Sequence, residues 1–349
     1  IMQRALVFPG QGSQVIGMGK ALADAFPVAR QVFQEVDDSL NQKLAALMFE
    51  GHESDLRLTE NAQPALMAVS VAVLRVLETE GNFRLPQAGR FVAGHSLGEY
   101  SALCAAGALT VADAARLLKQ RGQAMQSAVP VGIGGMAALL GLDLAQAQEI
   151  AAAAAQDEVC AAANDNAPGQ VVISGHIGAV DRAIALAAEK GFKRSVKLPV
   201  SAPFHCALMQ PAADVMRVAL DKVTIRPPAV PVIANITAAP VTEPEQIRKL
   251  LVEQVTGAVR WRESMLYLKE QGVEQIVECG AGTVLAGLMK RMREPGRIAG
   301  RQTRTQVEHV LEDRDRDDAA KISEARPDPD RIRRRAAAHL GRCGALSGS

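Results

Sequence analysis

The sequence predicts an α/β protein with a parallel sheet and a smaller inserted subdomain. Across the first 295 residues, short β-rich runs alternate with longer helical patterns, which is typical of parallel sheets covered by helices. Within this region, residues 132–200 show elements in the order βαββαβ, which matches a ferredoxin-like unit. The composition then changes near Gly296. We therefore expect a discontinuous large domain at 2–131 and 201–295, a ferredoxin-like subdomain at 132–200, and a tail at 296–349.

Apolar runs that end at glycine or proline define the strands, and longer periodic runs define the helices. In the large domain, the expected strands are Arg4–Phe8, Arg90–Gly94, Val230–Ile236 and Gln275–Cys279. Its expected helices are Leu97–Ala106, Ala207–Asp221, two across Pro244–Gln271, and Thr283–Arg293. The expected strands of the subdomain are Gly135–Gly141, Val159–Ala163, Gln170–Ser174 and Phe192–Leu198, and its helices are Leu144–Ala155 and Ala179–Lys190.

Composition excludes several classes of protein. The chain has 349 residues, with 39 Lys and Arg against 38 Asp and Glu, so its formal net charge is +1. This balance argues against nucleic-acid binding, and an aromatic content of 3% gives little support for base stacking. The longest apolar run, Ala65–Leu74, is too short to cross a bilayer. The five cysteines are scattered and never form CxxC, which favours reduced thiols over a zinc site. We expect a soluble cytoplasmic protein.

The last 54 residues differ from the rest of the chain. Residues 296–349 hold 12 Lys and Arg and 9 Asp and Glu, but only 8 Leu, Ile, Val, Met or Phe. Such a segment cannot bury enough apolar surface to offset its chain entropy. We therefore expect a disordered tail with a helix near Gln306–Glu312, or a C-terminus that is not native.

A candidate nucleophile lies between a predicted strand and a predicted helix. Gly94-His95-Ser96-Leu97-Gly98 fits the G-x-S-x-G pattern, and this context is the one that a nucleophile elbow requires. The large domain is accordingly expected to resemble the α/β-hydrolases. Ser96 would stand at a sharp turn, and the N–H of Leu97 could face a developing oxyanion. The alternative is that Ser96 only caps the helix.

A serine nucleophile needs a base near neutral pH, and two histidines come into question. His95 is adjacent to Ser96, but consecutive side chains leaving a strand point to opposite faces. His205 follows a Pro-bounded turn that could direct it inward, although a core histidine would look the same. No Asp or Glu stands out as a third member, so a carbonyl oxygen would have to hold the imidazole tautomer.

Two further segments are candidates for ligand binding. The loop at 9–14 can expose backbone N–H groups, but it is neither G-x-G-x-x-G nor a P-loop, so nucleotide binding has little support. Its alternative is an ordinary strand-to-helix loop. Arg121 lies on a largely apolar helix and could grip a carboxylate with two hydrogen bonds. Without further information, a solvated surface arginine is the preferred interpretation.

The chain resembles the malonyl-CoA:acyl carrier protein transacylases, which are acyltransferases of fatty-acid and polyketide synthesis. The matching segments occur in the family's order across residues 2–293. They are FPGQGSQ at 8–14, GHSLGEYSAL at 94–103, RGQAM at 121–125, NAPGQVVISG at 166–175, LPVSAPFHCALMQPAA at 198–213, and ECGAGTVLAGLMKR at 278–291.

The resemblance implies roles for individual residues. Ser96 would be the acylated nucleophile and His205 its general base. The N–H groups of Gln11 and Leu97 would form the oxyanion hole. Arg121 would then pair with the malonyl carboxylate.

Three more positions carry implied roles. The main-chain carbonyl of Gln254 would orient the histidine, which fills the place of the missing Asp. Phe204 and Met125 would lie at the substrate, and the bulk of Phe204 would disfavour an α-methyl branch.

The implied activity is ping-pong transfer of malonyl from malonyl-CoA to the phosphopantetheine thiol of acyl carrier protein, supplying fatty-acid biosynthesis without a cofactor or metal. Lys193, Arg194 and Lys197 would meet an acidic carrier protein or form a solvated strand face. A polyketide-type acyltransferase, a serine esterase and a silent carrier-protein-binding module are the alternatives. An esterase should show an Asp or Glu between its serine and histidine, and it has no use for Arg121.

Overall fold

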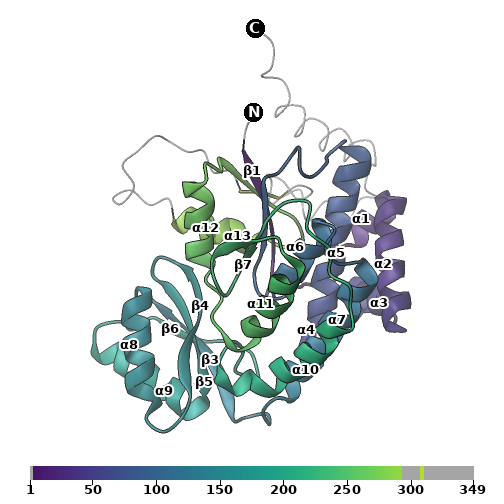
Figure 1. The fold of residues 1–349 in the computed structure, drawn as a ribbon. Helices are drawn as coiled ribbons and strands as arrows, with labels where there is room; N and C mark the ends of the chain where they lie inside the picture. Colours follow the sequence, from purple (N-terminus) through teal and green to yellow (C-terminus); the bar gives the residue numbers. More distant parts are fainter. Residues whose placement is uncertain (1–2, 293–306, 310–349) are drawn as a thin grey trace.

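The protein folds into two units, each built on its own sheet (Figure 1). We describe a computed structural model, which covers residues 3–292 and 307–309. The larger unit contains a six-stranded sheet with helices on both faces, and the smaller unit contains a four-stranded sheet. Both units combine strands with helices, so the protein has the α/β class that the alternation of strand and helix patterns predicts.

The large sheet is parallel except at one edge. Its strands are β1 (Arg4–Phe8), β2 (Phe91–Gly94), β7 (Val232–Ala234), β8 (Ala239–Val241), β9 (Gln275–Glu278) and β10 (Val307–His309). They run in the order β10-β9-β1-β2-β7-β8, and only the pairing of β7 with β8 is antiparallel. In the middle of the sheet, Phe8 pairs with Gly94. Because both residues end their strands, the loops that follow β1 and β2 leave the sheet side by side.

Side chains of β1 alternate between two hydrophobic layers. Leu6 and Phe8 join the cluster on one face, whereas Ala5 and Val7 join the cluster on the other. This period of two follows from the pleat of a strand. The first layer is formed by α1 (Lys20–Ala25), α2 (Pro27–Leu40), α3 (Leu44–Glu50), α4 (Glu53–Arg57), α5 (Thr59–Glu80), α6 (Gly98–Ala105), α7 (Val111–Ser127), α10 (Gln210–Asp221) and α11 (Pro244–Thr256). The second layer is formed by α12 (Trp261–Glu270) and α13 (Val284–Arg291) (Figure 1).

Helix α5 is apolar because it belongs to the core. It is the one helix in the described residues that is long and apolar enough to cross a membrane by length and composition. However, 83% of its apolar window is buried inside the protein. Its apolar residues therefore pack against α2, α6 and α7.

The small unit is an antiparallel sheet covered on one face by two helices. Its elements are β3 (Gly134–Leu140), α8 (Leu144–Ala155), β4 (Cys160–Ala167), β5 (Gln170–His176), α9 (Ile177–Glu189) and β6 (Ser195–Lys197). The strands run in the order β4-β5-β3-β6, and all pairings are antiparallel. Helix α8 begins with a capping box in which Asp143 and Gln146 satisfy each other's backbone N–H groups. This unit follows the predicted order of elements closely.

The predicted helix near Gln306–Glu312 is wrong over residues 307–309. These residues form β10, which pairs in parallel with β9 and so satisfies backbone groups at the sheet edge. The rest of the predicted tail, 296–306 and 310–349, lies outside the described residues.

Other differences concern the ends of elements and have local causes. The predicted helix Ala207–Asp221 divides into a 3₁₀ turn, η1 (Ala207–Met209), and α10. Pro211 lies in the first turn of α10, where its missing N–H is tolerated. Strand β8 was not expected, because it contains Pro240, and it occurs at the sheet edge where proline is accepted.

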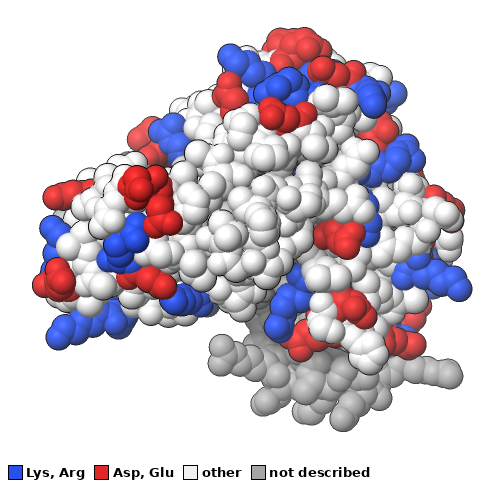
Figure 2. Space-filling model, turned by 90° about the horizontal axis from the view of Figure 1, so that it is seen from below, with Lys and Arg blue, Asp and Glu red and all other residues white. Residues whose placement is uncertain are grey.

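Charged side chains of both signs are interspersed on the face seen from below, around a broad uncharged area (Figure 2). A surface that binds nucleic acid usually gathers basic side chains on one face. The charge distribution on this face therefore agrees with the overall balance of charges in the sequence.

Candidate active site

Ser96 stands at a sharp turn between β2 and α6. Its backbone is left-handed, with φ of 55°, which is uncommon for a residue other than glycine. The turn is possible because glycines flank it. A Cβ on Gly94 would overlap the carbonyl group of Gly98, and a Cβ on Gly98 would overlap the carbonyl oxygen of Phe8. The chain around Ser96 therefore has the geometry that the elbow pattern predicts.

His205 lies against the Ser96 hydroxyl. The distance between Ser96 Oγ and His205 Nε2 is 2.7 Å, and His205 Nδ1 lies 2.9 Å from the main-chain oxygen of Gln254. Because a carbonyl oxygen only accepts, Nδ1 carries the proton and Nε2 is free to accept from the serine hydroxyl. The fold thus brings together the two residues that the sequence pairs, across 109 positions of chain.

Burial keeps the His205 imidazole neutral. The side chain is 4% exposed, and desolvation lowers its pKa from 6.5 to about 3, with the nearby Arg121 charge acting in the same direction. A neutral imidazole is the form that can take a proton from serine. The orienting group is a carbonyl oxygen and not a carboxylate, so no negative charge raises the pKa of the ring again.

Arg121 is buried beside the nucleophile, so the interpretation as a solvated surface arginine is wrong. Its side chain is 1% exposed. Nη1 donates to Gln63 Oε1 at 2.8 Å, and Nη2 donates to Gln254 Oε1 at 2.8 Å and to Ser96 Oγ at 3.3 Å. Tyr100 places its ring 5.7 Å from the guanidinium carbon. The guanidinium is therefore fixed in one orientation at the hydroxyl.

The charge of Arg121 has no anionic partner among the described residues. Its hydrogen-bond partners are two neutral amides and the Ser96 hydroxyl, and Nε is buried without a hydrogen-bond partner there. Glu99 is close, but burial raises the pKa of its carboxyl from 4.5 to about 8, so it is mostly protonated near neutral pH. A buried cation held by neutral groups is a ready site for a carboxylate.

The loop after β1 packs against the elbow. A Cβ on Gly10 would lie 2.6 Å from the carbonyl oxygen of His95, so glycine allows this close approach. The side chain of Gln11 is held by Thr59, whose Oγ1 donates to Gln11 Oε1 at 2.8 Å. Within residues 3–292, the N–H groups of Gln11 and Leu97 donate to no other group. Both remain free for an incoming oxygen.

The structure also places the other predicted substrate residues. Met125 is 2% exposed, and its Sδ lies 3.7 Å from Gln63 Nε2, behind the amide that holds Arg121. Phe204 precedes His205 and packs against clusters of both the large and the small unit. It therefore lies where the two units meet.

His95 points away from the nucleophile. Its Nε2 lies 2.7 Å from Asn166 Oδ1 on β4, and its ring packs 5.5 Å from that of Trp261. Burial lowers the pKa of His95, so this ring is also neutral. His95 connects the elbow to the small unit and does not compete with His205.

The remaining predicted residues are not part of this site. Lys197 forms an ion pair with Asp181 at 2.6 Å on the exposed surface of the small unit, and Lys193 and Arg194 are exposed nearby. Among residues 3–292 and 307–309, no group of three or more His, Cys, Asp or Glu side chains is arranged to hold a metal ion.

Comparison with known proteins identifies the family. Residues 5–326 match the acyl transferase domain. The chain belongs to this family. The match extends past residue 295, the boundary that we expected for the large domain. Part of the segment that we interpreted as a tail therefore aligns with the acyl transferases.

The relatives share most of their length with this acyl transferase. A protein named malonyl CoA-acyl carrier protein transacylase from Escherichia coli K12 is 47% identical over 290 residues, which is 83% of this chain and 93% of the relative. One of the same name from Bacillus subtilis 168 is 46% identical, over 82% and 90% of the two chains.

Solved structures of malonyl-transacylases have a fold similar to that of this chain. The acyl-carrier-protein-S-malonyltransferase from Bartonella henselae superposes with a TM-score of 0.82 at 55% identity, over 84% and 93% of the two chains. A complex of a type II PKS acyl-carrier protein with its malonyl-transacylase gives a TM-score of 0.80 at 45% identity, over 83% and 93%.

Sequence reasoning missed three polar residues at the centre of this acyl transferase. Gln63 holds Arg121, Asn235 holds the Ser96 N–H, and Glu99 accepts from the Asn235 N–H. Each is buried. The available signal was a polar residue within an apolar stretch, because a buried polar side chain must have a partner.

Proposed function

We propose that this protein transfers a malonyl group from malonyl-CoA to the phosphopantetheine thiol of acyl carrier protein, through a malonyl ester on Ser96. The names of the relatives and the arrangement of Ser96, His205 and Arg121 support this activity. Under this proposal, the large unit is an α/β-hydrolase-like domain. The small unit is an inserted ferredoxin-like subdomain, and its strand order β4-β5-β3-β6 supports that assignment.

The first half-reaction forms the acyl-enzyme. Ser96 Oγ attacks the thioester carbonyl carbon while its proton passes to His205 Nε2, and the Gln254 carbonyl oxygen stabilises the imidazolium through Nδ1–H. The N–H groups of Gln11 and Leu97 donate to the tetrahedral oxyanion. The carbon–sulfur bond then breaks, and His205 returns the proton to the leaving thiolate of coenzyme A.

The second half-reaction reverses these steps with a different thiol. The phosphopantetheine thiol gives its proton to His205 and attacks the ester carbonyl. The carbon–oxygen bond breaks, Ser96 recovers its proton, and malonyl leaves as a thioester of the carrier protein. Because each half-reaction uses the same base and the same oxyanion site, one site suffices for both substrates.

Recognition of the carboxylate is assigned to Arg121, and its burial is the observation on which the function rests. A guanidinium that is 1% exposed, 3.3 Å from the nucleophile and without an anionic partner among the described residues is costly unless a substrate supplies the charge. Nη2 and the unpartnered Nε lie on one edge of the guanidinium, and that edge could bind a carboxylate with two hydrogen bonds. Phe204 and Met125 would restrict the acyl group to an unbranched one.

A second pathway is supported by one comparison. The compared complex contains a type II PKS acyl-carrier protein, so a polyketide carrier protein is an alternative acceptor for the same chemistry. A serine esterase is disfavoured, because His205 is oriented by a carbonyl oxygen and because an esterase has no use for a buried cation. A cytoplasmic location is in keeping with the four free cysteines of the described residues.

Intact-protein mass spectrometry tests the proposal. The protein is mixed briefly with malonyl-CoA or acetyl-CoA, and a malonyl adduct is expected on the wild type but not on Ser96→Ala. Arg121→Ala should lose the preference for malonyl over acetyl. Subsequent addition of holo acyl carrier protein should remove the adduct and load the carrier. The absence of any adduct on folded wild-type protein would contradict the proposal and favour a silent carrier-protein-binding module.

A further inference from the structure

Asn235 forms two hydrogen bonds to the backbone immediately before the side chain of the nucleophile. Its side chain is 1% exposed and follows β7 directly. Nδ2 donates to the carbonyl oxygen of Gly94 at 2.7 Å, and Oδ1 accepts from the Ser96 N–H at 2.8 Å. One amide therefore holds the two peptide groups on either side of His95, immediately before the side chain of the nucleophile.

These two bonds act on the conformation that catalysis needs. Ser96 is left-handed, and a non-glycine residue holds this conformation only where its surroundings enforce it. The bond to Oδ1 also occupies the N–H of Ser96. The next N–H, that of Leu97, is left as the donor for the oxyanion.

Asn235 is itself held from three directions. Its N–H donates to Glu99 Oε1 at 2.6 Å, its carbonyl oxygen accepts from the Arg260 N–H at 3.0 Å, and Gln254 Nε2 donates to Oδ1 at 3.2 Å. The bond from Gln254 links Asn235 to the residue whose carbonyl oxygen orients His205.

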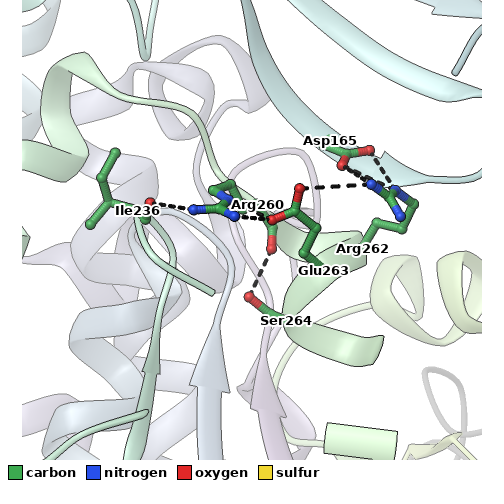
Figure 3. A network of polar contacts seen from close by, with 6 residues as sticks. All are labelled: Asp165, Ile236, Arg260, Arg262, Glu263 and Ser264. Atoms are coloured by element: carbon green, nitrogen blue, oxygen red, sulfur yellow. Dashed lines mark hydrogen bonds and ion pairs between the residues drawn. The ribbon is translucent and has the colours of Figure 1, made fainter. Parts of the chain in front are cut away.

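Arg260 extends this support to the small unit. Figure 3 shows its guanidinium between the carbonyl oxygen of Ile236, at 3.4 Å, and the carboxylate of Glu263, where Nε lies 2.6 Å from Oε2. Glu263 lies 3.8 Å from Arg262, which forms an ion pair with Asp165 of β4. The loop that carries Asn235 is therefore anchored on both units.

We propose that Asn235 is a positioning residue of the transacylation, which holds Ser96 in its left-handed conformation and directs the Leu97 N–H to the oxyanion. It acts through the backbone of the elbow and does not contact the substrate. The reaction with malonyl-CoA rests on the proposed function, whereas the effect on Ser96 reactivity does not.

The first experiment separates the acylation rate from substrate binding. Acylation by malonyl-CoA is followed by rapid mixing in the wild type and Asn235→Ala, with rates expressed per active site as titrated by a fluorophosphonate. In Asn235→Ala we expect the saturating rate constant to fall by about 30-fold or more. The malonyl-CoA concentration for half-saturation should change by less than about threefold, because Gln63 still holds Arg121.

Reaction with a fluorophosphonate probes the same residue without malonyl. Ser96 Oγ attacks phosphorus, fluoride leaves, and His205 takes the proton. Asn235→Ala should slow this reaction by a similar factor. If the wild type reacts with the fluorophosphonate but not with malonyl-CoA, the proposed function fails, and the fluorophosphonate rates alone then decide the role of Asn235.

Asn235→Asp provides a rescue that a merely structural role does not predict. A protonated carboxylic acid has the shape of the amide and can donate to the Gly94 oxygen while accepting from Ser96. An ionised carboxylate would instead repel the Gly94 oxygen. The rate for Asn235→Asp should therefore rise as pH falls from about 8 to about 5.5.

The pH profile of the wild type serves as the reference for this rescue. Among the titratable and charged groups near Asn235, Glu99 on α6 accepts from its N–H, and the N–H of Arg260, before α12, donates to its carbonyl oxygen. Arg121 on α7 and His205 bond to Gln254, and His95 precedes Ser96. All are shared by the two proteins, so the ratio of their rates reports the introduced carboxyl.

Asn61→Ala is the matched control, because Asn61 is a buried asparagine at the start of α5 that bonds Gln42 and Lys119. It should lose stability but keep the wild-type rate per titrated site. An Asn235→Ala protein that has fewer active sites but an unchanged rate per site would overturn the proposal. So would an Asn235→Asp protein whose rate relative to the wild type does not depend on pH.

Discussion

The guanidinium of Arg121 donates to the hydroxyl of Ser96 across 3.3 Å, so a buried cation and the nucleophile share one site. The same guanidinium is held from behind by Gln63 and Gln254. A substrate that brings a carboxylate to Arg121 is thereby also brought to Ser96. We therefore expect this one side chain to determine both binding selectivity and reaction geometry.

Replacing Arg121 with Met should abolish selectivity for malonyl-CoA while keeping side-chain volume. Loss of a charge-assisted contact in a buried site is worth about 2–3 kcal/mol, which corresponds to roughly 30- to 150-fold in kcat/KM for malonyl-CoA. Loading from acetyl-CoA should change little, because acetyl makes no such contact. The rates of both substrates, measured on one preparation, give the ratio.

The control for this prediction is Arg116→Met. Arg116 lies on the same helix, but its side chain is 54% exposed and pairs with Asp113 at 3.4 Å. It should behave as the wild type. Equal losses with malonyl-CoA and acetyl-CoA in Arg121→Met would show that Arg121 supports the fold of the site and does not select the acyl group.

The acylation rate should not fall as the solution becomes mildly acidic. Burial lowers the pKa of His205 from 6.5 to about 3, and the neutral ring is the active form. Reaction with a fluorophosphonate should therefore stay within about twofold between pH 8 and pH 5. An acid limb with a midpoint near 6.5 would contradict this prediction.

The same shift links His205 to stability. Its folded-state pKa is below the unfolded value, so its contribution is fully present above pH 6.5 and is lost as pH falls toward about 3. In His205→Gln, the free energy of unfolding should decline less over this range. Urea titrations of both proteins at a series of pH values measure the difference.

Glu99 should have the opposite effect on stability. Burial raises its pKa from 4.5 to about 8, so the folded state retains a proton that the unfolded state loses. The contribution of Glu99 is present below pH 4.5 and is lost as pH rises through about 8. Glu99→Gln keeps an acceptor for the Asn235 N–H but never ionises.

The free energy of unfolding should therefore decline less with rising pH in Glu99→Gln than in the wild type. Glu149→Gln, on the exposed face of α8, is the control and should follow the wild type. If the wild type and Glu99→Gln show parallel pH curves, Glu99 is ionised in the folded protein near neutral pH.

The ion pair between Asp165 and Arg262 should stabilise the junction of the two units. Asp165 is 2% exposed, and its carboxylate lies 2.9 Å from Arg262 Nη2. Asp165→Ala leaves a partly buried guanidinium without this partner and should cost about 2–4 kcal/mol. Equilibrium unfolding in urea measures the loss.

An exposed ion pair within the small unit provides the comparison. Asp181 and Lys197 have side chains that are 50% and 59% exposed, so Asp181→Ala should cost less than about 1 kcal/mol. Similar losses in Asp165→Ala and Asp181→Ala would show that the buried pair contributes no more than a surface pair.

The fold was predictable where the pattern was local. Arg4–Phe8 and Leu144–Ala155 coincide with β1 and α8, because their apolar periodicity and their ends lie within a few residues of one another. Strands β8 and β10 were missed. Strand β8 is short and contains proline, and the backbone bonds of β10 come from β9, with the whole of α13 between the two strands in the sequence.

The site was predictable only in part. The elbow at Ser96 depends on glycines within five residues, so the sequence alone identified it. The burial of Arg121 did not follow from its own helix, since it depends on Gln63 of α5 and Gln254 of α11. A contact between distant helices leaves no local periodicity to detect.

By itself, the sequence determined the α/β class, the turn that exposes Ser96, and a family resemblance that named His205 and Arg121. The tertiary structure decided that Arg121 is buried without an anionic partner among the described residues, and that Asn235 holds the elbow from the loop after β7. The physical reason is the distance along the chain over which each feature is determined. Turns and strands follow from neighbouring residues, whereas desolvation and hydrogen-bond partners are set by whatever the rest of the chain packs around a side chain.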